Sequence, residues 1–142
     1  MEVISDRLKV GLLEFRCFSK GKHIDIRSPI WNEVEQHILD SESHEIAGLY
    51  AHVITFNLDG SFSAISNLTV DSDGEYHLVT YVGDEDPDYV RTPIKPNHDD
   101  VGTVSVGGNP WNKSALVKGK GFLLKVFKYY IETGYFDPEL MS

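Results

Sequence analysis

The sequence predicts an α+β fold, with a mainly antiparallel sheet of about five to six strands and two amphipathic helices packed on one face. Three observations support this prediction. Short segments of alternating apolar residues follow one another across glycine-containing turns, which favours antiparallel hairpins. Two segments, at about 29–42 and 114–133, instead repeat apolar residues at helical spacing. The 142 residues are enough for one domain, 1–142, with its own core.

The first two elements are predicted to be paired strands at 12–18 and 23–27. Apolar and charged residues alternate in LLEFRCF and again in HIDIR, as expected for strands with one buried face. The intervening SKGK contains the glycine that a tight turn needs.

The first helix is predicted in SPIWNEVEQHILDSES. Ser28 is a favoured N-cap residue and Pro29 fits the first helical position. Ile30, Val34 and Ile38 recur on one side, which is therefore the side expected to face the sheet.

Three further strands are predicted at 48–58, 61–70 and 75–82, with Asp59-Gly60 as the turn between the first two. Tight turns would place two sets of residues on opposite faces of this meander. The first set is Ala51, Leu68 and His77, and the second is His52, Asn67 and Leu78. Two histidines on opposite faces cannot share a metal ion, so this register argues against a metal site there.

The C-terminal third is predicted to hold a strand at 101–108 and the second helix at about 114–133. Two starts are open for this helix, because NPW gives a cap-plus-proline signal whereas Gly119 and Gly121 would each weaken a helix by about 1 kcal/mol. The part from 122 to 133 carries the clearest apolar stripe.

The net charge of -9 is the most informative bulk property. Such a surface repels phosphate backbones, which disfavours a nucleic-acid partner, and attracts a basic protein. The alternative is that the acids serve solubility alone. The single cysteine, the lack of a signal peptide and the lack of a long apolar run lead us to expect a cytoplasmic protein without a membrane partner.

Motifs for catalysis are missing from the sequence. There is no P-loop, no dinucleotide fingerprint and no zinc-protease motif, so we expect no enzyme activity, no cofactor and no metal. His98 and its two acidic neighbours could contact a divalent cation, but three consecutive loop residues rarely close a site alone. DSDGE fits a hairpin turn better than a calcium loop.

The segment 83–100 is the strongest candidate for binding, because one third of it is acidic and it contains three of the six prolines. Aromatic residues flanked by charge are common interface anchors, and proline stiffness lowers the entropy lost on binding. The predicted partner-binding residues are Asp84, Glu85, Asp86, Asp88, Tyr89, Asp99, Asp100 and Trp111. The alternatives are an ordinary solvated loop pinned by Tyr89, and a Trp111 that plugs the end of the sheet.

The C-terminal quarter, VSVGGNPWN followed by ALVKGKGFLLKVFKYYIETGYFDPEL, resembles bacterial toxin-immunity proteins of the Imm1-like group and of contact-dependent growth inhibition systems. Tyr130, Thr133, Gly134 and Pro138 match a helix ending in aromatic-x-x-Thr-Gly-x-x-x-Pro. The chain departs from the Imm1-like pattern in having no tryptophan after Pro138.

This resemblance implies a small cytosolic protein that neutralises a cognate toxin domain, often a nuclease with a basic active site, by stoichiometric binding. The alternative function is a small enzyme or ligand-binding domain with its site in the sheet or beneath the 83–100 loop. A homo-oligomeric adaptor is a third possibility. The sequence leaves the oligomeric state and the identity of the toxin open.

Overall fold

The computed structural model describes residues 2–5, 9–19, 21–83, 86–94 and 101–142. Within these ranges the chain forms nine strands, two α-helices and two 3₁₀ turns. The strands are β1 (Glu2–Ser5), β2 (Lys9–Ser19), β3 (Lys22–Arg27), β4 (Ile46–Asn57), β5 (Phe62–Asp73), β6 (Tyr76–Val82), β7 (Thr103–Val106), β8 (Asn109–Asn112) and β9 (Val117–Lys118). The helices are α1 (Trp31–Asp40) and α2 (Gly121–Thr133), and the 3₁₀ turns are Ser43–Glu45 and Lys113–Ala115.

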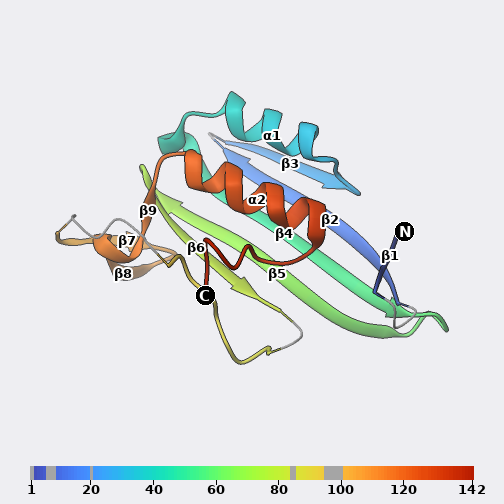
Figure 1. Cartoon of the computed structure of the whole chain (residues 1–142). Coiled ribbons are helices and arrows are strands. Elements are labelled where there is room, and N and C mark those ends of the chain that lie inside the picture. Colours follow the sequence, from blue (N-terminus) through green and yellow to red (C-terminus); the bar gives the residue numbers. More distant parts are fainter. Residues whose placement is uncertain (1, 6–8, 20, 84–85, 95–100) are drawn as a thin grey trace.

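An antiparallel sheet forms the centre of the molecule (Figure 1). Its strands follow the order β1-β2-β4-β5-β6-β9, with β3 as a seventh strand beside β2. The pairing of β2 with β3 and the β4-β5-β6 meander confirm the predicted hairpins. The predicted α+β class is therefore confirmed.

The predicted faces of the meander and the register between β4 and β5 are confirmed, but His77 lies opposite Ser72 of β5 rather than opposite Leu68. Ala51 pairs with Leu68, and His52 pairs with Asn67. Leu68 in turn pairs with Tyr81, which lies on the same face of β6 as His77. His52 and His77 consequently lie on opposite faces, as the turn lengths predicted.

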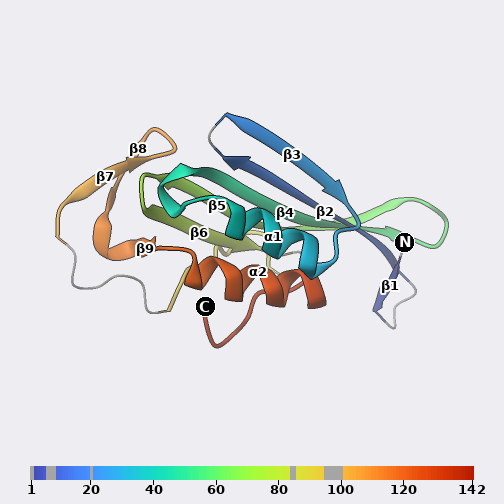
Figure 2. The ribbon, with the colours of Figure 1, turned by 90° about the horizontal axis from the view of Figure 1, so that it is seen from above.

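Both helices cover one face of the sheet, and the core lies between them and the strands (Figure 2). Helix α1 buries Val34 and Ile38, as predicted from its spacing, but Ile30 precedes the helix and is 60% exposed, so its predicted place on the buried side is wrong. Helix α2 buries Phe127 against Phe15 of β2, with ring centroids 5.8 Å apart in an edge-to-face arrangement. Alternate residues of the strands point to the opposite face, which is not covered by a described helix.

The start of α1 differs from the prediction. The helix begins at Trp31 after an extended Ile30, and Glu33 accepts a hydrogen bond from the Ile30 N–H at 3.2 Å. Ser28 is not the N-cap: it has a positive φ of 49°, and its N–H donates to the Leu13 carbonyl at 2.8 Å. The entry to the helix is therefore fixed by a backbone hydrogen bond to the sheet and by the Glu33 side chain, rather than by a Ser28 cap.

The predicted start of the second helix at 114 is wrong. Helix α2 begins at Gly121, which agrees with the stripe at 122–133 but not with a start at NPW. Residues 117–118 instead form β9, which pairs with the first residues of β6. Gly119 has φ 74°, a left-handed conformation that interrupts a helix and suits glycine. Gly134 ends the helix in the same conformation, as expected for a C′ glycine.

The chain before β9 forms a separate two-stranded hairpin of β7 and β8. Strand β7 confirms the strand predicted at 101–108, whereas Asn109–Asn112 is a strand rather than a helix start. Gly107 and Gly108 have φ values of 60° and 82°, the requirement of a two-residue type I′ turn. None of the described helices is long and apolar enough to cross a membrane.

Candidate functional site

The described part of the 83–100 segment is fixed to the body by backbone hydrogen bonds. Arg91 and Tyr81 exchange N–H···O bonds of 2.9 and 3.0 Å, so the segment forms an isolated antiparallel bridge with β6. Thr92 and Ser142 exchange two more, of 3.1 and 3.0 Å, and the Ile94 N–H donates to Leu140 at 2.9 Å. Both the sheet edge and the last three residues therefore position the segment.

Tyr89 combines exposure with a structural contact. Its side chain is 47% exposed, and its ring centroid lies 5.0 Å from the Arg91 guanidinium. The same guanidinium lies 4.4 Å from the ring of Phe136, so Arg91 contacts both aromatic rings. The interpretation of Tyr89 as a residue that pins the segment is consistent with this contact, while half of its surface stays available.

The acidic residues of the segment divide into two groups. Asp86 and Asp88 are exposed at a turn in which the Tyr89 N–H donates to the Asp86 carbonyl at 3.1 Å. Four other predicted partner-binding residues lie outside the described residues, and so does His98. These four are Asp84, Glu85, Asp99 and Asp100.

Trp111 lies on β8, opposite Val104 of β7, and is 36% exposed. Figure 1 places the β7–β8 hairpin beyond one end of the sheet, well away from the yellow segment that contains 86–90. The structure therefore does not bring Trp111 and Tyr89 into one patch. They belong to two separate surfaces of the protein.

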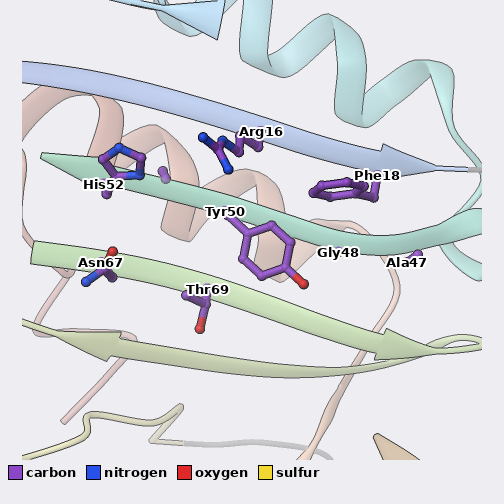
Figure 3. Close-up of a pocket in the computed structure, with 9 residues that line it drawn as sticks. Arg16, Phe18, Ala47, Gly48, Tyr50, His52, Asn67 and Thr69 are labelled. Carbon is purple, nitrogen blue, oxygen red and sulfur yellow. The ribbon is translucent and has the colours of Figure 1, made fainter. Parts of the chain in front are cut away.

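A hollow of about 580 Å³ lies on the helix-free face of the sheet (Figure 3). Its lining comes from β2, β4 and β5, and none of the described residues of the 83–100 segment contributes to it. The lining residues are Arg16, Phe18, Ala47, Gly48, Tyr50, Ala51, His52, Asn67 and Thr69.

The position of the Tyr50 ring shapes this hollow. Tyr50 donates a hydrogen bond of 2.6 Å to Asp71, which holds the ring near Gly48, two residues earlier on the same strand. A Cβ at position 48 would lie 2.6 to 2.8 Å from three ring atoms, so only glycine permits this placement. Burial, together with the hydrogen bond to Asp71 and its negative charge, raises the pKa of Tyr50 to about 12.

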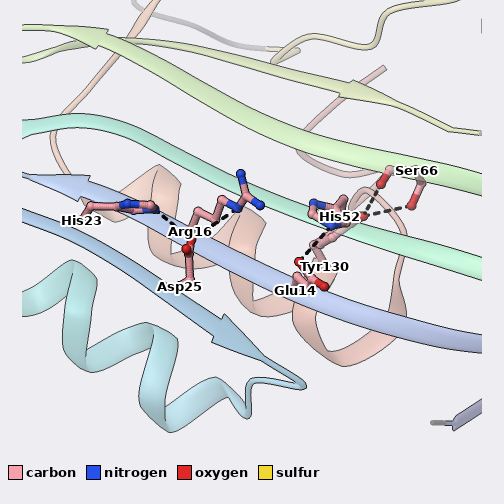
Figure 4. Close-up of polar contacts among 7 residues, drawn as sticks. All are labelled: Glu14, Arg16, His23, Asp25, His52, Ser66 and Tyr130. Atoms are coloured by element: carbon pink, nitrogen blue, oxygen red, sulfur yellow. Dashed lines mark hydrogen bonds and ion pairs between the residues drawn. The ribbon is translucent and has the colours of Figure 1, made fainter.

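Pairs of acidic and basic side chains flank the hollow (Figure 4). The Arg16 Nε lies 3.3 Å from Asp25, which also receives His23 Nε2 at 2.9 Å. In the next row His52 Nε2 lies 3.4 Å from Glu14. Each acid thus already has a partner on this face.

Aromatic and hydroxyl groups complete the surroundings. The rings of Phe18 and His23 stack at 4.4 Å and 9°, and the hydroxyls of Thr69 and Thr80 lie 2.6 Å apart. On the opposite side of the sheet, the Tyr130 hydroxyl donates to the Ser66 carbonyl at 3.0 Å (Figure 4). That contact belongs to the core and not to the hollow.

The arrangement offers hydrogen-bonding groups and rings rather than metal ligands. Among the described residues, no group of three or more His, Cys, Asp or Glu side chains could hold a metal ion. No sequence motif includes Arg16, Tyr50 or Thr69. The signal that could have found them is the pair Gly48-x-Tyr50, since a glycine inside a strand marks a place where something approaches the backbone.

The fold and site define an α+β protein with two helices on one face of an antiparallel sheet and an open, polar and aromatic hollow on the other. By its sequence the chain belongs to the "Family of unknown function (DUF6911)", whose model matches residues 12–140. No curated protein sequence matches the chain.

A solved structure, "Crystal structure of a hypothetical protein from Neisseria gonorrhoeae", has a similar fold. It matches with a TM-score of 0.60 over 94% of this chain and 96% of that chain, at 13% identity. This likeness extends the fold assignment and says nothing of function.

Proposed function

We propose that the protein is a non-catalytic immunity protein that binds a basic toxin domain and thereby neutralises it. The observation that carries the proposal is the anchored acidic turn at 86–90. Asp86, Asp88 and Tyr89 are exposed there, while Arg91 and its neighbours are fixed by backbone pairing. A turn that is ordered before binding loses little conformational entropy on docking.

Electrostatics support the same proposal. A net charge of -9 attracts a basic partner at long range, and carboxylates around an exposed aromatic ring complement a cationic cleft. The C-terminal resemblance to immunity proteins supplies the partner class, a toxin domain such as a nuclease with a basic active site. The cytoplasm is the expected compartment, since there the toxin would act.

The test is binding between this protein and the toxin domain encoded immediately upstream. We expect a stoichiometric complex on co-expression, with affinity that falls as salt rises. The charge-reversal variant D86K/D88K should weaken binding at least ~10-fold, mostly through slower association. Its matched control is E42K/E132K, which changes the net charge equally at two exposed positions outside the turn.

A weakening that is the same in both variants would assign the effect to overall charge and would contradict a docking turn. A neighbouring gene product that neither binds nor harms cells would refute the immunity function itself. The alternative, an enzyme or ligand-binding domain with a site beneath the 83–100 loop, would instead predict that D86K/D88K leaves ligand binding unchanged.

A further inference from the structure

We propose that the hollow on the helix-free face of the sheet is a binding site for small hydroxylated aromatic carboxylates. This site is independent of the proposed function, because it uses none of the residues of the anchored turn. The strand register decides which side chains of β2, β4 and β5 line the hollow, and these side chains decide which ligand it can bind.

The hollow exists because the Tyr50 side chain does not lie between its two cross-strand neighbours. Arg16, Tyr50 and Thr69 are cross-strand neighbours on β2, β4 and β5. The Tyr50 ring leans toward Gly48 and is held there by Asp71. Figure 3 shows this ring displaced along β4, which leaves the space between the side chains of the three strands open.

Arg16 provides the recognition of a carboxylate. Only its Nε contacts Asp25, and its terminal nitrogens have no partner among the described residues. A guanidinium presents its remaining N–H donors in a planar fork that matches the two oxygens of a carboxylate. The nearby acid Glu14 already faces His52, so it does not occupy the fork.

Across the hollow from Arg16, the side chains of β5 can bind a ligand hydroxyl. Asn67 makes no side-chain hydrogen bond to any described residue, and it lines the hollow beside Thr69. Strands β2 and β5 are separated by β4, so their backbones lie about 10 Å apart. One aromatic ring with a carboxylate at one end and a hydroxyl at the other fits between these walls.

The floor and the size agree with such a ligand. The Tyr50 ring offers an aromatic surface, and the volume of about 580 Å³ falls within the range of about 300–1,000 Å³ typical of small-molecule sites. Because Arg16 lies beside an aromatic ring, the hollow favours an anion that carries an aromatic ring of its own.

The experiment is an NMR titration of the ¹⁵N-labelled full chain with 4-hydroxybenzoate. We expect saturable shifts centred on β2, β4 and β5 with a dissociation constant of ~1 mM, the range for a ligand of this size. The neutral isostere 4-hydroxybenzamide should bind at least ~10-fold more weakly, because it cannot form the charge-assisted pair.

The variant R16Q should weaken 4-hydroxybenzoate ~10-fold, whereas R27Q should change the affinity less than ~2-fold. Arg27 is a matched control, since it is an exposed arginine on the same face and its loss changes the net charge equally. The proposal is overturned if no saturable shift occurs up to ~20 mM, if acid and amide bind equally, or if both variants weaken binding alike. The comparison of acid with amide uses the unchanged protein, so it decides the question even where R16Q fails to fold.

Discussion

The substitution Gly48→Ala tests how the helix-free face is built. The new Cβ would lie 2.6 Å from the Tyr50 oxygen and 2.7 and 2.8 Å from two ring carbons, distances that no packed structure tolerates. Because the ring is the end of a side chain, it can swing away, but the movement breaks its hydrogen bond to Asp71. The backbone at Gly48 is not left-handed, so the strain comes from this contact alone.

The magnitude follows from two opposing terms. A hydrogen bond to a charged carboxylate contributes about 1.5–3 kcal/mol. Alanine is favoured over glycine within a strand by about 0.5–1 kcal/mol, which offsets part of the loss. We therefore expect Gly48→Ala to lower the free energy of unfolding by about 1–2 kcal/mol, a measurable fraction of a typical domain stability.

The assay is urea unfolding of four proteins: the parent chain, G48A, Y50A and G48A/Y50A. Once the Tyr50 ring is absent, alanine at position 48 meets no obstacle, and we expect it to be neutral or stabilising by about 0.5–1 kcal/mol. If G48A costs the same free energy with and without the ring, or costs nothing in the parent chain, the account of the hollow is wrong.

Two further predictions concern buried polar groups on the helix side of the sheet. Burial lowers the pKa of His77 from 6.5 to about 4, so the unfolded chain binds the proton more readily and stability is lost as the pH falls from 6.5 to 4. Urea unfolding should show this loss, roughly 3 kcal/mol, in the parent chain and in H44Q but not in H77Q; an unchanged pH slope in H77Q would contradict it. Tyr130→Phe removes the hydroxyl that bonds to Ser66 and should cost about 1–2 kcal/mol, whereas Tyr129→Phe on the same helix should cost less than ~0.5. Equal costs in a thermal melt would refute that assignment.

The parts of the fold that could be predicted depend on local patterns. Alternation in β2 and β3 and the turn at Asp59-Gly60 were sufficient to predict the strands and their register, because a slip of one residue would expose a buried face. The error at the second helix has an equally local cause. The Gly107-Gly108 turn requires positive φ values and forms a hairpin, whereas the Asn-Pro pair that follows it also fits one of the two helix starts that the sequence leaves open.

The candidate sites could be predicted less well, because they depend on where side chains go rather than on which elements form. The acidic character of the 83–100 segment is evident from the sequence. Its hydrogen bonds to Leu140 and Ser142 are long-range contacts, for which the sequence contains no local signal. The hollow requires the Tyr50 ring to lean toward Gly48, and an alternating strand pattern says only that both residues share a face.

The pairing of Thr92 with Ser142 joins residues that are about fifty positions apart in the sequence. The loop between them includes α2 and the β7–β8 hairpin, so closing it costs entropy that only the folded body compensates. Loss of the pairing would release this segment into a broader ensemble without altering any residue that the partner is proposed to touch. In the proposed complex, changes in the last three residues would therefore act on binding through the conformational entropy of the acidic turn rather than through contact with the partner.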